Sequence, residues 1–399
     1  MLQRLWQSVR RDLFERQAAH FPALDGLRAI AALLIVAFHS ELWLRMGRPK
    51  SLAALPAWVH WLFFNGWVGV DIFFVLSGFL IGRMLLLQLQ GGQIHFRAFY
   101  IRRTFRIFPA YYLVLTLSIF VFARVSMFRA LYDGVPWETL LRRSWANYLY
   151  VSNYAYGGQI QNAMAWGWSL CIEEHFYLIL PLLLTVLFRC AGRGGRLMVL
   201  VVLSFLPLVA RFEALPPHPL LALRIYHESH THFDGLLLGV LIAYGYVFYG
   251  TPLSQVASRV GPLLWVAALC CFAAVFKWGG LWAPGLFALV LQFLLLAVGS
   301  SLLVINGLCC PNRVSRFLAH PAWCPVARLS YGIYLIHFFP ILLVLSWWPN
   351  HTNPTVTSSV VSLLLFVAAA TVLTVLGAAA LFLALERPML DWGARLSRR

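Results

Sequence analysis

The chain has 399 residues, of which 61% are hydrophobic and only 11% are charged. An ordinary soluble domain carries about 25% charged residues, so this composition excludes that class and indicates an integral membrane protein. The formal net charge is +17. The arginines stand mainly at the ends of apolar runs, which is typical of membrane topology and lipid headgroup contacts, and we expect no nucleic-acid partner.

Residues 1–20 alternate apolar and basic side chains at helical spacing, with Leu2, Trp6 and Val9 among the apolar ones. This pattern predicts an amphipathic helix that lies on the bilayer surface. The apolar run that follows carries Arg28, His39 and Glu41, which argues against a cleaved signal peptide. We therefore expect it to stay as the first membrane-spanning helix.

Apolar runs long enough to cross a hydrocarbon core of about 30 Å recur along the whole chain. The expected spans are 26–45, 62–88, 106–124, 166–188, 197–211, 231–249, 260–277, 283–305, 329–348 and 359–385. The aromatic and polar stretch 140–156 is expected to lie at an interface without crossing. The sequence thus predicts an all-α integral membrane protein with one ten-helix domain over 21–390 and a short basic tail over 391–399.

Arginine and lysine positions predict the orientation of these spans. Most of them fall on one side when the N-terminus is placed in the cytoplasm, so both termini are expected there. The seven cysteines have no Cys-x-x-Cys spacing and no histidine-paired spacing, which predicts free thiols and no metal site. No phosphate-binding glycine loop and no serine nucleophile elbow is present.

Arg28 and His39 form the most informative pair in the chain. An eleven-residue step turns an α-helix by about three turns plus roughly 20°, so both side chains share one face about 16 Å apart. Ionisable groups inside a bilayer cost several kcal/mol and usually serve a function. Among side chains, imidazole titrates closest to neutral pH, so His39 is a candidate general base. Two interpretations are open for Arg28: a functional group on the same helix face as His39, or an arginine that extends its charged end to the membrane edge.

Further motifs appear at intervals along the rest of the chain. They are GVDIFFVLSGF over 69–79, RTFRIFP over 103–109, WSLCIEEHFY over 168–177, HFDG over 232–235, SYGIYLIH over 330–337 and ERP over 386–388. Together with Arg28 and His39 they resemble the acyltransferase-3 family of bacterial integral membrane O-acyltransferases over nearly the whole chain. Some relatives add a soluble esterase-like domain, and since this chain stops soon after Pro388 we expect the membrane domain to act without one.

The resemblance implies a multi-pass protein of the bacterial cytoplasmic (inner) membrane that uses acyl-CoA, with acetyl-CoA as the expected donor, and needs no metal. It implies the general-base role for His39, and it assigns Arg103 and Arg106 to the donor. Guanidinium groups suit the phosphates of coenzyme A. Positive-inside topology alone also explains an arginine cluster at this place.

Glu173 lies about 10 Å inside its span and needs a partner or a watery cavity. It is expected to orient the imidazole or bind a sugar hydroxyl, with a structural pairing as an equal alternative. Asp71 and Ser77 in the second span are open to substrate contact, although helix packing is favoured for them.

A last group of candidate substrate-binding residues lies in the fourth and ninth spans. Tyr331, Tyr334 and His337 share one helix side at steps of three, which suits either a substrate path or satisfied polar packing. Trp168 is a candidate for stacking on a sugar, against the default of an interfacial tryptophan belt. Ser169 and Tyr177 in the same motif complete the set.

The expected function is transfer of an acyl group from cytoplasmic acyl-CoA to a hydroxyl of a cell-surface glycan or glycolipid in the bilayer. Direct transfer is preferred because no nucleophile is evident beside His39. The alternative is a polytopic transporter or flippase for a lipid-linked saccharide, whose topology would look the same. The sequence does not decide the oligomeric state.

Overall fold

The structure of this chain is a computed structural model that describes residues 13–15, 21–132, 134–156, 162–215, 221–281, 283, 285–349 and 354–398. Every regular element among these residues is a helix. The all-α prediction is therefore confirmed for this part of the chain. The predicted surface helix over 1–20 lies almost entirely outside the described residues.

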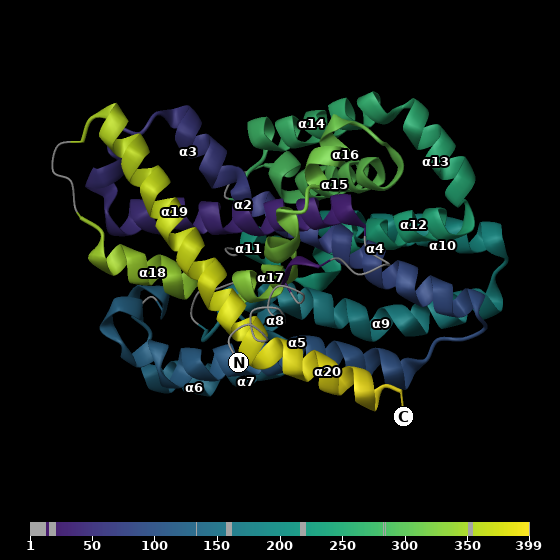
Figure 1. Cartoon of the computed structure of the whole chain (residues 1–399), viewed down its shortest axis with the longest axis horizontal. Helices are drawn as coiled ribbons and strands as arrows, with labels where there is room; N and C mark the ends of the chain where they lie inside the picture. Colours follow the sequence, from purple (N-terminus) through teal and green to yellow (C-terminus); the bar gives the residue numbers. More distant parts are fainter. Residues whose placement is uncertain are drawn as a thin grey trace. The chain divides into compact units, whose positions relative to one another are not determined.

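Figure 1 shows the helices in sequence colours, from purple near the N-terminus to yellow at the C-terminus. The helices of the first half are α2 (Pro22–Gly47), α3 (Ala57–Phe64), α4 (Gly69–Gln90), α5 (Phe96–Phe120), α6 (Trp137–Arg143), α7 (Trp145–Tyr148), α8 (Ser152–Ala155) and α9 (Trp168–Cys190). Those of the second half are α10 (Arg193–Glu213), α11 (Leu221–His227), α12 (Asp234–Phe248), α13 (Gly250–Arg259), α14 (Gly261–Trp278), α15 (Gln292–Cys309), α16 (Arg313–Leu318), α17 (Trp323–Ile336), α18 (Phe338–Trp347), α19 (Val356–Leu381) and α20 (Arg387–Leu396).

Eight helical segments of the described residues are long and apolar enough to cross a membrane, or up to ten if each of two bent helix pairs counts as one span. This range includes the ten spans expected from the sequence. The stretch 140–156 contains only short helices, α6 to α8, so it does not cross. The orientation of the termini stays a prediction.

One expected span, 329–348, is bent, the span 231–249 is followed at once by a sharp bend, and the helix after the last span continues further than the sequence suggested. The helices α12 and α13 meet at 110°, and α17 and α18 meet at 69° around His337. Pro340 explains the second bend, because its ring has no N–H and clashes with the carbonyl four residues earlier. At the C-terminal end, a π-helical turn over Phe382–Glu386 leads into α20, which includes most of the predicted tail.

The chain divides into two compact units. Unit 1 comprises residues 1–69, 98–144 and 320–399, and unit 2 comprises residues 70–97 and 145–319. In unit 1, α2 packs against α17 and α19. Figure 1 shows the yellow-green α19 crossing the purple α2. Segments about 300 residues apart in sequence thus surround the helix that carries Arg28 and His39.

In unit 2, the helices α4 and α12 approach at two glycines. A Cβ on Gly78 would lie 2.1 Å from the Leu236 carbonyl oxygen, and a Cβ on Gly239 would lie 2.3 Å from that of Val75. Only glycine allows such an approach of two helix backbones. The packing function expected for this part of the motif 69–79 is therefore confirmed for Gly78.

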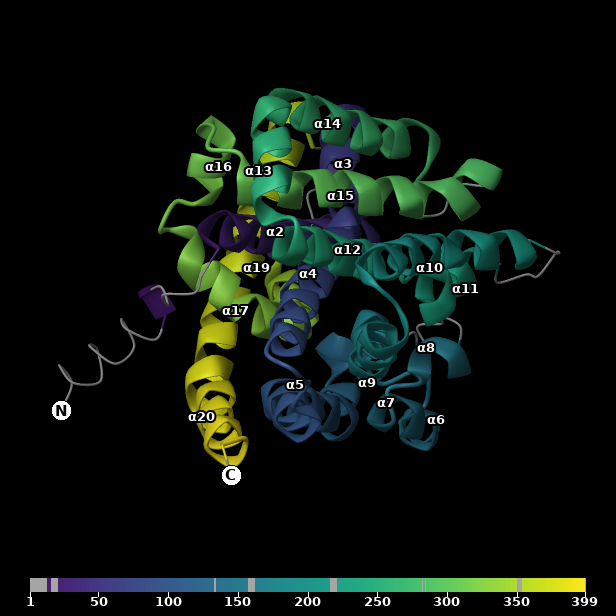
Figure 2. The same cartoon turned by 90° about the vertical axis from the view of Figure 1, so that its right-hand side faces the viewer.

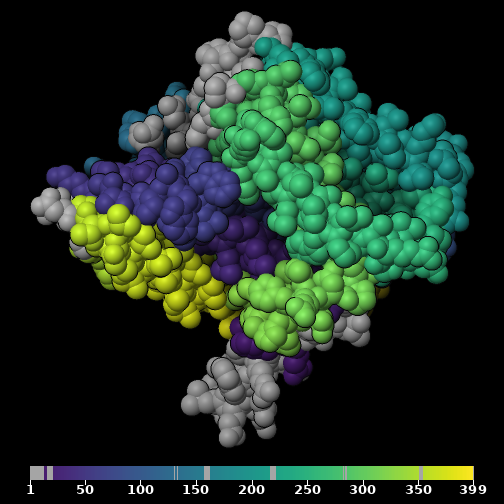
Figure 3. Space-filling model, turned by 90° about the horizontal axis from the view of Figure 1, so that it is seen from above, coloured from purple at the N-terminus to yellow at the C-terminus, as the bar shows by residue number. Residues whose placement is uncertain are grey.

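The same unit presents an apolar outer helix. Figure 2 shows α14 and α15 running side by side, and these helices are in contact. Leu263, Val266 and Leu269 on α14 are 66%, 56% and 60% exposed, and this helix lies on the face of unit 2 seen in Figure 3. So much exposed apolar surface on one helix is typical of a lipid-facing position.

Candidate active site

His39 lies in the second half of α2, and the residue has intermediate exposure. Its Nδ1 is 3.0 Å from the carbonyl oxygen of Ile35, one turn earlier on the same helix. The ring also contacts Phe338, with centroids 4.6 Å apart. The imidazole is thus held on one side by its own helix and on another by the start of α18, all within unit 1.

A second histidine completes this contact. His337, which the sequence placed among the substrate-binding candidates, is fully buried at the break between α17 and α18. Its Nε2 lies 3.1 Å from Nδ1 of His39. The two rings form a histidine pair 298 positions apart in sequence. The expected substrate contact of His337 is not tested by this geometry.

Glu41, two residues after His39, is a buried charged residue that the sequence analysis left without a function. Its Oε1 accepts a hydrogen bond from Nε of Arg45 at 2.7 Å and lies 2.8 Å from Nδ1 of His60 on α3. The four-residue spacing of Glu41 and Arg45 in an apolar helix was the signal that could have revealed the ion pair. His60 could not be linked to it from sequence.

Arg28 lies on the first turns of α2, on the helix face that it is predicted to share with His39. It has intermediate exposure and is therefore accessible. Arg103 and Arg106 lie on α5, the latter exposed. Glu386 is buried and close enough to Arg106 for an electrostatic interaction. The motif 103–109 and the motif 386–388 therefore meet in unit 1.

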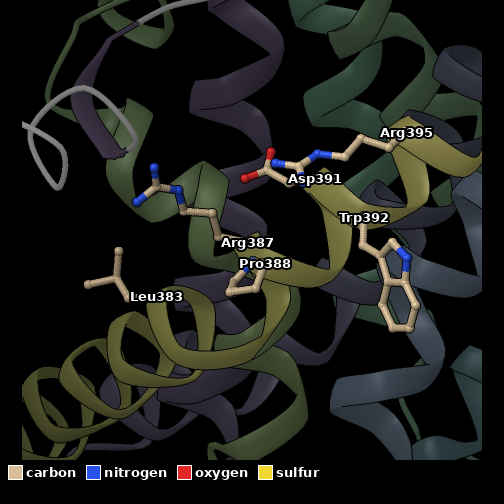
Figure 4. Close-up of a pocket in the computed structure, with 6 residues that line it drawn as sticks. All are labelled: Leu383, Arg387, Pro388, Asp391, Trp392 and Arg395. Carbon is tan, nitrogen blue, oxygen red and sulfur yellow. The ribbon is translucent and has the colours of Figure 1, made fainter.

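A pocket of about 370 Å³ lies along the last helix of unit 1, close to this place. Its described lining, drawn in Figure 4, consists of Leu383, Arg387, Pro388, Asp391, Trp392 and Arg395. The ring of Trp392 contacts Phe105, with centroids 5.2 Å apart, and Phe105 stands between Arg103 and Arg106. Two arginines of the pocket, together with the carboxylate of Asp391, therefore belong to the same region of unit 1 as Phe105 in the first half of α5.

The two tyrosines of α17 make different contacts, one with α5 and one with the histidine pair. Tyr331 donates its hydroxyl to the Ile107 carbonyl oxygen at 2.7 Å, which links α17 to α5. The Tyr334 carbonyl oxygen lies 2.6 Å from Nδ1 of His337. Tyr331 thus has the structural bond that the sequence allowed for it, and Tyr334 contributes its backbone to the histidine pair.

Unit 2 brings together three residues that the sequence predicted separately. The hydroxyl groups of Ser77 on α4 and Tyr177 on α9 share a short hydrogen bond. Tyr177 also donates to Oε2 of Glu173 at 3.1 Å, one turn away on α9. Glu173, Tyr177 and Ser77 thus form a continuous polar line between two helices, with Glu173 and Ser77 partly exposed.

Asp71 is paired with a histidine that the sequence analysis did not single out. Its Oδ1 lies 3.1 Å from Nε2 of His232, whose Nδ1 lies 2.7 Å from the Tyr226 carbonyl oxygen. Trp168 stacks on His232 with centroids 5.7 Å apart and planes 16° apart, and it is only 8% exposed. Ser169 next to it is also buried. Their predicted contact with a sugar therefore requires a path into the protein.

A fully buried ion pair lies beside this histidine in the same unit. Arg211 on α10 forms two hydrogen bonds with Asp234, at 2.6 and 2.9 Å, and donates to the carbonyl oxygens of Thr231 and Val290. All the guanidinium nitrogens thus have acceptors, which is what a charge needs away from water. Asp234 belongs to the motif HFDG over 232–235, whereas the sequence did not identify Arg211 as its partner.

His227, the last residue of α11, gives a testable effect of pH. Burial lowers the pKa of His227 to about 4, and the nearby His232 adds to this effect, whereas the Leu223 carbonyl opposes it. A histidine with a depressed folded-state pKa stabilises the fold above pH 6.5, and this contribution is lost as the pH falls toward 4.

We expect about 2 kcal/mol of unfolding free energy to be lost between pH 8 and pH 5 through His227 alone. Unfolding of the detergent-solubilised protein, followed by tryptophan fluorescence at both pH values, measures this loss. His227→Gln cannot titrate there and should show a pH dependence smaller by that amount. An identical pH dependence in wild type and variant would contradict the assignment.

No group of three histidine, cysteine or acidic side chains that could hold a metal occurs within the part of the chain that the structure describes. The seven cysteines are free thiols, as predicted.

Comparison with known proteins decides the family. The acyltransferase-3 profile, which describes an acyltransferase domain, matches residues 21–383. The chain belongs to the acyltransferase-3 family. With eight to ten apolar helices in its described part, this family member is a multi-pass membrane protein.

Two curated relatives illustrate the match. The chain is 27% identical over 350 residues to "Peptidoglycan O-acetyltransferase OatA" of Listeria monocytogenes, covering 84% of this chain and 52% of the relative. It is 27% identical over 339 residues to "Putative peptidoglycan O-acetyltransferase YrhL" of Bacillus subtilis, covering 81% and 49%. The chain thus spans about half the length of these relatives. No solved structure matches it.

Proposed function

We propose that this protein is a membrane O-acyltransferase that moves an acetyl group from acetyl-CoA to a hydroxyl of a cell-surface glycan or lipid-linked sugar, with His39 as the general base. Family membership supports the reaction class. The printed activity of the relatives, O-acetyl transfer to peptidoglycan, supports acetyl as the group and a glycan as the acceptor. We place it in the bacterial cytoplasmic membrane, with both termini in the cytoplasm.

The position of His39 carries this proposal. Its Nδ1 faces the Ile35 carbonyl oxygen, so the hydrogen of a neutral imidazole belongs on Nδ1 and the lone pair on Nε2. The residue has intermediate exposure, and the proposal requires that a substrate hydroxyl reach Nε2 of its ring. A general base needs such an atom within hydrogen-bond reach of the proton that it removes.

The donor is proposed to bind beside the first half of α5, at Arg103 and Arg106. Arg103 and Arg106 would hold the phosphates of coenzyme A, because guanidinium groups bind phosphate oxygens in pairs. The pocket at α20 adds Arg387 and Arg395 to the same region through the contact of Trp392 with Phe105. Arg28 would attract the donor along the face of α2.

The acceptor is proposed to contact unit 2. The line of Glu173, Tyr177 and Ser77 offers a carboxylate and two hydroxyl groups to a sugar, and Asp71, Trp168 and Ser169 are buried in the same unit. Tyr331 and Tyr334 stay proposed as contacts along the substrate path in unit 1.

Purified protein in detergent or nanodiscs tests the reaction class. With acetyl-CoA labelled in the acetyl group, we expect slow hydrolysis alone and faster loss of label when a glycan acceptor is added, with the label recovered as an ester on the acceptor. Uptake of a lipid-linked saccharide into proteoliposomes without any use of acetyl-CoA would instead identify a transporter and refute the proposal.

The double substitution Arg103→Ala and Arg106→Ala tests the donor site. Each phosphate hydrogen bond from a charged donor is worth about 1.5–3 kcal/mol, so coenzyme A affinity should fall at least about tenfold. Isothermal titration with coenzyme A measures it. Arg97→Ala with Arg102→Ala removes the same charge from two exposed neighbours and serves as the matched control. Equal weakening in both double variants would favour general electrostatics over a phosphate site.

A further inference from the structure

The break between α17 and α18 places His337 where an uninterrupted helix would not. Pro340 prevents regular helix formation through this segment, and the bend of 69° is centred on His337. The buried ring points back to the Tyr334 carbonyl oxygen at 2.6 Å and to His39 at 3.1 Å. Both ring nitrogens of His337 are therefore used.

These contacts fix the position of the hydrogen on each ring. A carbonyl oxygen only accepts, so Nδ1 of His337 donates to Tyr334 and Nδ1 of His39 donates toward Ile35. With a hydrogen already on Nδ1 of His39, the facing Nε2 of His337 must accept. A neutral His337 whose lone pair faces His39 satisfies all three contacts.

From this geometry we propose that His337 is a positioning residue that holds His39 in the Nδ1–H form and keeps its Nε2 lone pair available to the acceptor hydroxyl. The inference rests on the proposed function, because it presumes that His39 is the base. His337 acts through His39 and leaves the substrate contact to that residue. In many proteins a hydrogen-bond partner on one ring nitrogen of a histidine fixes the tautomer, so that the other nitrogen can bind a metal or a proton. His337 would have this function for His39.

The proposed step balances in protons and bonds. The hydroxyl proton of the acceptor moves to Nε2 of His39 while the hydroxyl oxygen attacks the thioester carbonyl carbon. The carbon–oxygen bond forms and the carbon–sulfur bond breaks, and the coenzyme A thiolate takes the proton back from Nε2. Throughout, the Nδ1–H of His39 stays donated to Nε2 of His337, which stabilises the transient imidazolium.

Two substitutions separate this positioning effect from simple loss of packing. His337→Ala removes the acceptor and should lower kcat about 10- to 100-fold, because partner groups behind a functional imidazole contribute this much. His337→Gln keeps an amide oxygen near the place of Nε2 and should recover most of kcat. The KM for acetyl-CoA should change less than about twofold in both. Leu335→Ala, two residues earlier on the last turn of α17 and equally buried, is the matched control for a cavity.

The tautomer of His39 can be measured by NMR, and a change in packing alone would not alter it. Nitrogen-15 NMR of histidine-labelled protein, with the His39 signals assigned through a His39→Ala sample, should show hydrogen on Nδ1 in wild type and His337→Gln. In His337→Ala, Nδ1–H keeps the Ile35 carbonyl oxygen but loses its second acceptor, so a measurable share of the Nε2–H tautomer should appear. A single unchanged tautomer in His337→Ala, or a kcat loss no larger than that of Leu335→Ala, would overturn the inference.

The outcome also distinguishes this inference from the proposed function. Loss of transfer in His39→Ala together with a full rate in His337→Ala would refute only the positioning role. Full rates in both variants would refute His39 as the base. A loss in both, with recovery in His337→Gln, supports the two together.

Discussion

Acyl transfer by His39→Ala is expected to fall about 10²- to 10⁴-fold, because a positioned general base contributes this range and no other described imidazole makes the contacts of His39. The effect should appear in kcat, since the phosphates of the donor are proposed to bind elsewhere. Release of labelled acetyl groups from acetyl-CoA onto the acceptor, at saturating donor, measures it.

Two controls separate a loss of the base from the loss of any histidine and from misfolding. His95 is exposed, so His95→Ala removes a histidine without disturbing the pair and should keep the full rate. Size-exclusion profiles and thermal unfolding of His39→Ala should match wild type within the range of an ordinary core substitution. Transfer by a well-folded His39→Ala at a rate near that of wild type would end the assignment.

The second large effect concerns stability and arises from the buried pair of Arg211 and Asp234. Asp234→Leu leaves the guanidinium group buried without its carboxylate, which should cost about 3–5 kcal/mol. Both side chains are at most 1% exposed, so water offers little compensation. Denaturant unfolding of the solubilised protein, or its yield after heating, measures the loss.

A double substitution tests the reason for that loss. Arg211→Met with Asp234→Leu removes both charges and should be more stable than Asp234→Leu alone, because replacing a whole buried pair is far less costly than breaking it. Glu213→Ala, two residues further on an exposed part of α10, should be nearly neutral. Additive losses in the double variant would show that the pair does not act as a unit.

The sequence predicted most of the helices, and of the histidine pair it identified His39 as the candidate base. Span length and hydropathy depend on local composition, so the runs that contain α2, α5, α9 and α15 could be found without coordinates. The alignment of Arg28 with His39 follows from helix geometry alone. The bend at His337 was also within reach, because Pro340 stands three residues later, but a continuous span over 329–348 was expected instead.

The partners of the polar groups were not within reach of the sequence. His337 was placed among substrate contacts because its own helix gives three-residue steps with Tyr331 and Tyr334, whereas its bond to His39 depends on how α17 packs against α2. Asp71 and Trp168 were interpreted without His232, which lies 161 residues from Asp71. Arg211 attracted no attention, since an arginine near a span end has a simple topological explanation.

What the chain determined by itself is its membrane class, its helical segments, its family motifs and the face shared by Arg28 and His39, because these follow from composition and helix periodicity. Only the tertiary structure decided which buried polar atoms meet: His39 with His337, Asp71 with His232, and Arg211 with Asp234. The physical reason is that a hydrogen bond inside a helix bundle depends on the rotation and crossing of two helices, and short-range sequence patterns contain no information about either.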